Sequence, residues 1–167
     1  MVALVLLVVV TLIGLAAIRG TTMQQQMTSN FYDREASFQS AEAALRAGEA
    51  WVIANPTNTT NLRNCTTQQC IANPFDSGGA TAAQIQSVPT STFNAGALNV
   101  GQPQYVVEFM GNYTNPNSSV QQLSGCTTYG GCGSGNPNKY FRITARNGDP
   151  ASTPERSTVT IQSLFRS

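Results

Sequence analysis

The hydrophobic and polar positions divide the chain into an apolar beginning, an amphipathic stretch, a polar middle and a strand-rich end. Residues 1–18 contain no charged side chain, and Arg19 is the first charge. A helix of about 18 residues spans roughly 27 Å, close to the thickness of the apolar core of a bilayer. The pattern predicts a helix that lies in a membrane, or in a filament core of similar polarity. The residues expected to contact that environment include Leu4, Leu7, Val10, Leu12, Ile13 and Leu15.

A cleaved secretory signal is the competing interpretation of this apolar start, because short apolar stretches at a terminus are often removed. Three observations favour an uncleaved helix instead. No basic residue precedes the apolar run, no clear small-residue cleavage site follows Ile18, and helical periodicity continues past Arg19.

The stretch from residue 21 to residue 54 has the pattern of an amphipathic helix. Its large apolar side chains recur every seven residues, which the spacing of a coiled coil permits. Small residues share the same stripe, and they suit packing against a sheet equally well. The packing face is predicted to hold Met27, Phe31, Phe38, Ala41, Leu45 and Val52. The pair Asn55-Pro56 is predicted to end the helix, because the residue before a proline is disfavoured in helical conformation.

The remainder of the chain is predicted to form a globular head. Residues 56–103 are polar and rich in turn residues, with a weakly signalled helix at 80–86. Three strand-like runs follow at 105–110, 139–146 and 157–165, and the last two are expected to pair antiparallel. The fold class is therefore α+β, with a long protruding helix whose second half packs on a small C-terminal antiparallel sheet. The predicted division is 1–20 apolar helix, 21–54 amphipathic continuation and 55–167 head.

Composition argues against catalysis and against nucleic-acid binding. Charged residues make up 10% of the chain, the net charge is +1, and histidine is absent. Without histidine the chain has no residue of the type most often used as a general base or metal ligand. Lys139 is the only lysine. We expect no enzyme activity, no cofactor, no metal, no small-molecule substrate and no nucleic acid as a partner.

The four cysteines form two local pairs in polar segments, Cys65 with Cys70 and Cys126 with Cys132. An even count in an exported protein favours two short disulfide loops. A zinc site built from all four thiolates is the rival, although zinc sites favour two to four intervening residues, and these pairs have four and five, with no CxxC motif. Pairing between the two loops is the next option.

The N-terminal third carries a motif of known type. It reads TLIG, a stretch of small residues, RGTTMQQQM, and then DREASFQSAEAALR. This run resembles the N-terminal region of PilX-type minor pilins of the type IV pilus, and the ending YFRITAR…VTIQSLFR is similar to the closing strands of that family. The matching residues are 11–14, Arg19, 21–23, Met27, Asn30, 33–34, 38–39 and 41–46.

The resemblance implies a type IV pilin-like fold and a role in pilus assembly. It implies other minor pilins, the major pilin and a tip adhesin as partners, in a complex that supports piliation, twitching motility and adhesion. It also implies a single-pass protein of the bacterial inner membrane with a periplasmic head, which later enters the extracellular pilus.

Two departures from the family pattern refine that expectation. A basic prepilin leader is absent, which predicts that the sequence is the processed form or a slightly shorter one. Major pilins carry an early glutamate, whereas no acid occurs here before Asp33. By the logic of the family, a subunit without that glutamate belongs at or near the filament tip.

Two alternatives remain open. A type II secretion pseudopilin at the pseudopilus tip shares the long helix, but such proteins usually carry calcium-binding carboxylates, and Asp76, Asp149 and Glu155 are dispersed in this sequence. A membrane-tethered binding protein or enzyme unrelated to filaments is the other alternative.

Overall fold

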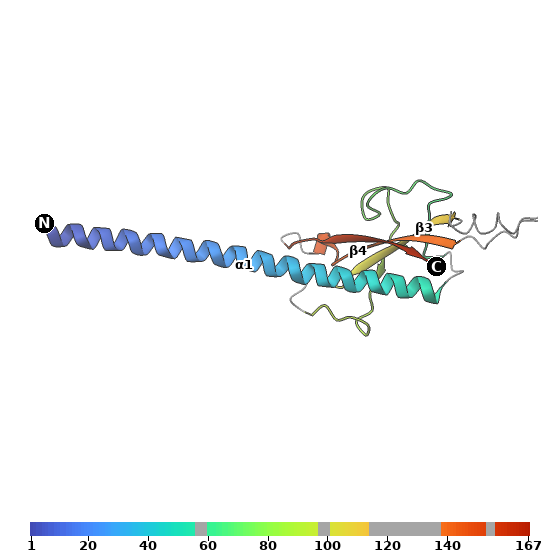
Figure 1. Ribbon diagram of the computed structural model, residues 1–167, viewed down its shortest axis with the longest axis horizontal. Helices are drawn as coiled ribbons and strands as arrows, with labels where there is room; N and C mark the ends of the chain where they lie inside the picture. Colours follow the sequence, from blue (N-terminus) through green and yellow to red (C-terminus); the bar gives the residue numbers. More distant parts are fainter. Residues whose placement is uncertain (56–59, 97–100, 114–137, 153–155) are drawn as a thin grey trace, which may run out of the picture.

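A single long helix carries a sheet on its second half, and its first half projects away from the rest of the chain (Figure 1). The computed structural model describes residues 1–55, 60–96, 101–113, 138–152 and 156–167. Helix α1 runs Val2–Ala54, and its 53 residues span about 80 Å. It continues without interruption through Gly14 and Gly20. The apolar and amphipathic stretches of the sequence are therefore two halves of one helix.

Asn55 ends the helix, as the Asn-Pro pair predicted. Its backbone N–H donates to the carbonyl oxygens of Trp51 and Val52, and its side-chain Nδ2 donates to the Trp51 oxygen at 2.9 Å. These bonds supply donors to carbonyl oxygens that have no N–H partner in a following turn of the helix.

The sheet is mixed, and its three long strands pair antiparallel. Strands β3, β4 and β5 are neighbours in that order, and both short strands pair with the other edge of β3, β1 parallel and β2 antiparallel. The strand bounds are Arg63–Asn64 for β1, Gln86–Ser87 for β2, Gln104–Tyr113 for β3, Asn138–Arg146 for β4 and Thr160–Arg166 for β5. A short 3-10 helix, η1, spans Pro150–Ser152.

The three predicted strands and the antiparallel pairing of the last two are confirmed. The helix predicted at 80–86 is wrong. In its place the carbonyl of Thr81 accepts bonds from the N–H groups of Gln84 and Ile85, and the chain then enters β2. A seven-residue helix gains too few bonds to offset its nucleation cost, whereas β2 gains partners on β3.

The core lies between α1 and the near face of the sheet, the face turned toward the helix. Alternate residues of β3 and β4 supply most of it. The buried apolar members are Ala44, Val52, Val88, Tyr105, Val107, Phe141, Ile143 and Ala145. The chain thus has the predicted α+β fold, with the helix covering one face of the sheet.

The predicted packing face of the helix is wrong in part. Ala41 and Val52 are buried and Leu45 is partly buried, but Met27 and Phe31 are 70% and 73% exposed. Phe38 is also 45% exposed. The helix residues that face the sheet are smaller than predicted: Ser37, Ser40, Ala41, Ala44, Gly48 and Val52.

Two physical reasons account for the difference. A strict seven-residue repeat drifts by about 20° per heptad around a straight helix, so the heptad stripe crosses the contact face at an angle. The sheet also approaches α1 closely, which small side chains permit. Met27 and Phe31 precede Asp33, the first helix residue that bonds to the head among the described residues.

Gly48 marks a close approach between helix and sheet. A Cβ atom there would lie 2.7 Å from Cγ2 of Ile143 and 3.2 Å from Cδ2 of Tyr105, whereas a Cβ at Gly20 would meet nothing within 4 Å. We expect Gly48→Ala to lower the free energy of unfolding by about 1–3 kcal/mol through overpacking. Gly20→Ala, the matched control, should strengthen the helix by up to about 1 kcal/mol. Denaturant unfolding of the full chain in detergent measures both, and equal effects would contradict the close approach.

Candidate assembly surface

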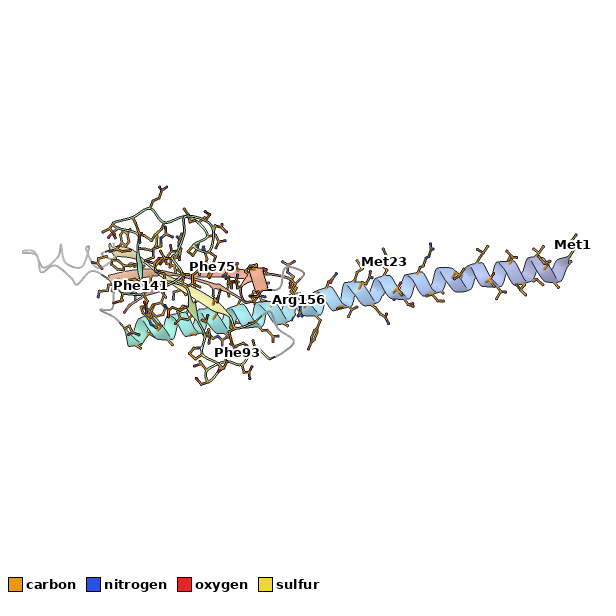
Figure 2. The ribbon with its side chains drawn as sticks, turned by 180° about the vertical axis from the view of Figure 1, so that it is seen from behind. Met1, Met23, Phe75, Phe93, Phe141 and Arg156 are labelled. Atoms are coloured by element: carbon orange, nitrogen blue, oxygen red, sulfur yellow. A yellow bond between two sulfur atoms is a disulfide. The ribbon has the colours of Figure 1, made fainter. Side chains whose placement is uncertain are left out.

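The projecting half of α1 exposes a continuous apolar surface. A segment of this helix is long and apolar enough to cross a membrane, and the rest of the described chain buries none of it. Between Met1 and Met23 the side chains point outward with no other segment beside them (Figure 2). The six residues predicted for the membrane or filament core are each 60–67% exposed: Leu4, Leu7, Val10, Leu12, Ile13 and Leu15.

The hydroxyl groups on this half of the helix are satisfied by the helix itself. Thr11 donates from Oγ1 to the Val8 carbonyl at 2.8 Å, and Thr21 donates to the Ile18 carbonyl at 2.9 Å. An unpaired hydroxyl costs free energy in an apolar environment, so these local bonds make the threonines compatible with lipid or with neighbouring helices.

The aromatic residues at the middle of α1 also face outward. Phe31 and Tyr32 are more than 70% exposed, just before the helix reaches the head. Phe31 and Phe38 line a shallow hollow together with Arg34 and Glu35. The larger members of the predicted packing face are therefore available to another molecule, whereas the smaller ones hold the sheet.

A polar clamp fixes the point at which the helix leaves the head. One Asp33 carboxylate oxygen accepts two bonds from the Arg156 guanidinium, the longer from Nε at 2.7 Å. The other accepts from the backbone N–H and the hydroxyl of Ser157, at 3.1 and 3.0 Å. One turn later Ser37 bonds to Ser157 as well. Because Asp33 precedes the sheet contacts, the clamp sets the direction of the projecting half relative to the head.

Protonation of Asp33 should weaken the clamp. The hydrogen bonds from Arg156 are the main cause of a lowered Asp33 pKa, opposed by desolvation and aided by the two bonds from Ser157. The stabilisation is therefore complete above the ordinary pKa of 3.8 and decreases as the pH falls through the lowered value. At neutral pH we expect Asp33→Asn to cost about 1 kcal/mol, since the Arg156 side chain remains partly exposed.

The measurement is the free energy of unfolding of the full chain in detergent, from pH 7 down to pH 3. The difference between the wild type and Asp33→Asn should shrink at the acidic end, because the unfolded wild-type chain takes up a proton at the ordinary Asp pKa while the folded chain, with its lowered Asp33 pKa, takes it up only at lower pH. Glu42→Gln is the control, since among the described residues Glu42 bonds only to the exposed Arg46 in the adjacent turn. A constant difference at all pH values would contradict the role of the charge.

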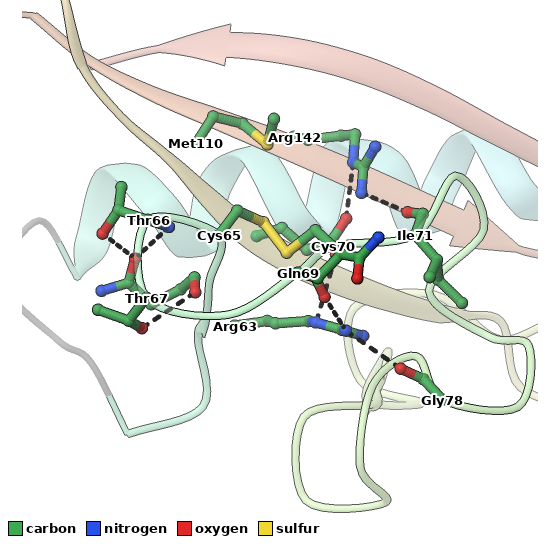
Figure 3. The surroundings of a disulfide bond; sticks show 12 residues. Arg63, Cys65, Thr66, Thr67, Gln69, Cys70, Ile71, Gly78, Met110 and Arg142 are labelled. Atoms are coloured by element: carbon green, nitrogen blue, oxygen red, sulfur yellow. Dashed lines mark hydrogen bonds and ion pairs between the residues drawn. A yellow bond between two sulfur atoms is a disulfide. The ribbon is translucent and has the colours of Figure 1, made fainter.

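The first cysteine pair forms a disulfide that closes a loop beside β1 (Figure 3). The Cα atoms of Cys65 and Cys70 lie 5.4 Å apart, and the Cys65 N–H donates to the Phe109 carbonyl at 2.9 Å. The Arg63 guanidinium donates to the carbonyls of Gln69 at 2.8 Å and Gly78 at 3.2 Å. The disulfide loop is thus attached to the sheet at both of its ends.

A buried charge cluster lies beneath this loop, on the far face of the sheet. Arg142 donates from Nε to Glu108 at 2.7 Å and from its other end to the Ile71 carbonyl at 2.6 Å. The Arg63 Nε lies 3.8 Å from the second Glu108 oxygen, and the side chains of Arg63 and Glu108 are only 4% and 0% exposed. Glu108 therefore pairs with two arginines from different strands, and both arginines bond to the segment that covers the far face of the sheet.

Sequence reasoning missed both the cluster and the clamp. The signal for the cluster was a charged residue inside an apolar strand, since Glu108 interrupts the run YVVEFM. A charge at such a position is costly unless it is paired. Nothing in the sequence identifies Arg63 as a partner, because β1 has two residues and only the parallel pairing with β3 brings it beside Glu108.

The sulfur atoms of Cys65 and Cys70 and the Glu108 carboxylate lie within 4.8 Å of one another, a spacing that could suit a metal ion. Both sulfurs are joined in the disulfide, so they offer no thiolate, and two guanidinium groups already surround Glu108. Cys126 and Cys132 lie outside the described residues. Their disulfide stays a prediction, which peptide mapping without reduction would check.

Comparisons with known proteins bear on the N-terminal part of the chain. Residues 1–46 match the family model described as PilX N-terminal. No curated protein and no solved structure matches the chain at a significant level. The match ends inside α1, and it includes the projecting half, the clamp residue Asp33 and four of the six helix residues that face the sheet. Residues 1–46 are thus similar to the PilX N-terminal family, and the chain resembles the PilX-type minor pilins in motif and in fold.

Proposed function

We propose that this protein is a minor pilin that acts in an initiating or tip complex of the type IV pilus. It would contact other minor pilins, the major pilin and a tip adhesin, and it would support piliation, twitching motility and adhesion. The PilX N-terminal family is a structural pilin family, which favours assembly over catalysis. The single observation that carries the proposal is the unburied, charge-free helix that precedes the head.

The physical argument concerns where that apolar surface goes. Leaving residues 2–18 in water would expose a continuous hydrocarbon surface, which is unfavourable in proportion to its area. In the inner membrane the segment lies in lipid, with the head in the periplasm. During assembly it moves from lipid to a core of neighbouring helices, and this exchange between two apolar environments costs little compared with transfer to water.

The head has a different task in this scheme. Among the described residues, both faces of its sheet are covered from within the chain, because α1 covers the near face and the disulfide segment reaches across the far face. The clamp at Asp33 holds the helix in a fixed direction. A rigid head on a directed helix can present the same outer surface to neighbouring subunits each time a complex forms.

Deletion of the protein tests the proposal. We expect loss or strong reduction of surface pili and of twitching, restored when the wild-type chain is supplied again. A restoring chain in which residues 11–14 are replaced by leucine separates an assembly element from a plain anchor, because a plain anchor should still work. Normal pili and motility after deletion would overturn the proposal, and a secretion defect with normal pili would indicate a type II secretion pseudopilin.

A further inference from the structure

The last strand of the sheet has an open edge. Strand β5 pairs with β4 on one side, and no backbone bond joins its other side to any of the described residues. In Figure 1 this red strand runs along α1 in the direction of the helix. The unpaired groups of such an edge can accept a further strand.

The hydrogen-bond pattern shows which residues face outward. Lys139 and Ser167 exchange both backbone bonds, at 3.2 and 3.0 Å, so this pair is a closely bonded one. Bonded pairs alternate along an antiparallel ladder. Residues 161, 163 and 165 therefore bond to β4. The residues that direct both N–H and C=O to the open edge are Thr160, Gln162, Leu164 and Arg166.

This edge lacks the features that usually prevent strand pairing. Such edges are commonly interrupted by proline, by a bulge or by lysine. The strand TIQSLFR contains no proline, keeps a regular register with β4, and is uncharged until Arg166. Leu164 is one of the residues whose backbone groups face the open edge, and it is 66% exposed.

An apolar ridge of the helix lies beside the same edge. Glu49 accepts a bond from Ser163 at 3.4 Å, and Ser37 bonds to Ser157 at 3.2 Å, so α1 and β5 run side by side in the same direction. At 100° per residue, Phe38 and Leu45 lie within about 40° of Glu49 on the helix surface. The half-exposed Phe38 thus borders the space that a strand added to β5 would occupy.

We propose that the outer edge of β5 is a docking site for an extended segment of another protein, which pairs with the outward groups of residues 160–166 as a sixth strand. Its backbone would provide the hydrogen bonds, and alternate apolar side chains of the segment would pack on Phe38 and Leu45. This inference goes beyond the assembly role proposed above, and only the choice between a different protein and a second copy rests on that role.

The direction of the helix argues for a different protein over a second copy. Antiparallel pairing is the more stable arrangement of two strands. Because β5 and α1 run in the same direction, antiparallel pairing of two β5 strands would direct the two apolar segments oppositely. Two apolar helices that point in opposite directions cannot both enter a membrane from the same side, and they cannot lie parallel in a filament core. A partner segment without its own apolar helix meets no such restriction.

Photo-crosslinking in intact cells tests the docking site. A photoreactive residue is placed at Leu164 or at Arg166 of the full chain, and the adducts are mapped by mass spectrometry. We expect adducts from the two positions on one partner segment, two residues apart in its sequence, as strand pairing requires. Tyr113, an exposed residue at the end of β3, is the control position and should give at least tenfold less adduct.

Proline at position 164 separates backbone pairing from side-chain contact. The Leu164 N–H faces the open edge, so Leu164→Pro removes a docking donor and leaves the β4 ladder intact, which protected amides at 163 and 165 would verify. Adducts from position 166 should fall at least tenfold in Leu164→Pro and stay within twofold in Leu164→Ala. If the proline variant does not fold, Leu164→Lys decides, because a charge on the edge opposes pairing.

Several outcomes would overturn the inference. They are adducts with lipid alone, adducts with a second copy of this chain, adducts scattered over unrelated sequences, and adducts that Leu164→Pro or Leu164→Lys leaves unchanged. Piliation is scored separately in the same strains. A loss of adducts with normal pili then bears only on the docking site. Adducts that remain after loss of the apolar helix bear only on the assembly role.

Discussion

Val10→Lys is expected to lower the amount of this protein in the inner membrane and in sheared pili by about 100-fold. Val10 lies near the middle of the charge-free segment and is 65% exposed there. A lysine at the centre of an apolar helix costs about 2.5–3.5 kcal/mol on insertion scales, and each 1.4 kcal/mol is a factor of about ten. Immunoblots of membrane and pilus fractions against total protein measure the change.

Two control variants show that the effect depends on position and charge. Val10→Leu keeps the apolar surface and should behave as the wild type. Met23→Lys places the same charge on an equally exposed residue beyond Arg19, where the helix is already polar, and should change the pilus fraction less than twofold. A normal pilus fraction for Val10→Lys would mean that this face of the helix does not meet an apolar environment.

Glu108→Gln is expected to lower the free energy of unfolding by about 3–5 kcal/mol, the cost of breaking a buried ion pair. The change keeps the shape of the side chain but leaves Arg142 without its 2.7 Å carboxylate partner and Arg63 without a nearby negative charge. Because both arginines also bond to carbonyls of the covering segment, this segment should loosen first. Denaturant unfolding and amide exchange of residues 63–78 in detergent measure the two effects.

The matched control for this variant is Glu42→Gln. Glu42 also pairs with an arginine, Arg46 in the next turn, but both side chains are largely exposed, at 42% and 74%. An exposed pair of this kind contributes about 0.3–0.5 kcal/mol. Equal losses in the two variants would show that burial of Glu108 does not raise the cost of removing its charge.

The helix and the long strands were predictable because their signals are local. Helix α1 ends at Ala54, just before Asn55 and Pro56, as the Asn-Pro pair predicted. The residues Phe141, Ile143 and Ala145, which alternate with polar residues along β4, lie in the core. In each case the pattern repeats with the geometry of the element itself, with a period of 2 in a strand and 3.6 in a helix.

The packing side of the helix was predictable only in part. A heptad of large side chains indicated Phe31 and Phe38, yet the sheet packs on the small residues Ala44 and Gly48. The side of an amphipathic helix that meets a sheet depends on how closely the two can approach. That distance is a property of both partners, so the helix sequence alone cannot give it.

The amino-acid sequence by itself determined the extended apolar helix, its end, the three main strands and the resemblance to PilX-type minor pilins. All of these follow from neighbouring residues or from a continuous motif. Only the tertiary structure decided that Asp33 meets Arg156, that Glu108 joins Arg63 to Arg142, and that β5 keeps an open edge. Asp33 and Arg156 are 123 residues apart in the sequence, and Glu108 is 45 residues from Arg63 and 34 residues from Arg142. Contacts across such separations depend on strand order and register, which are set by packing of the whole chain.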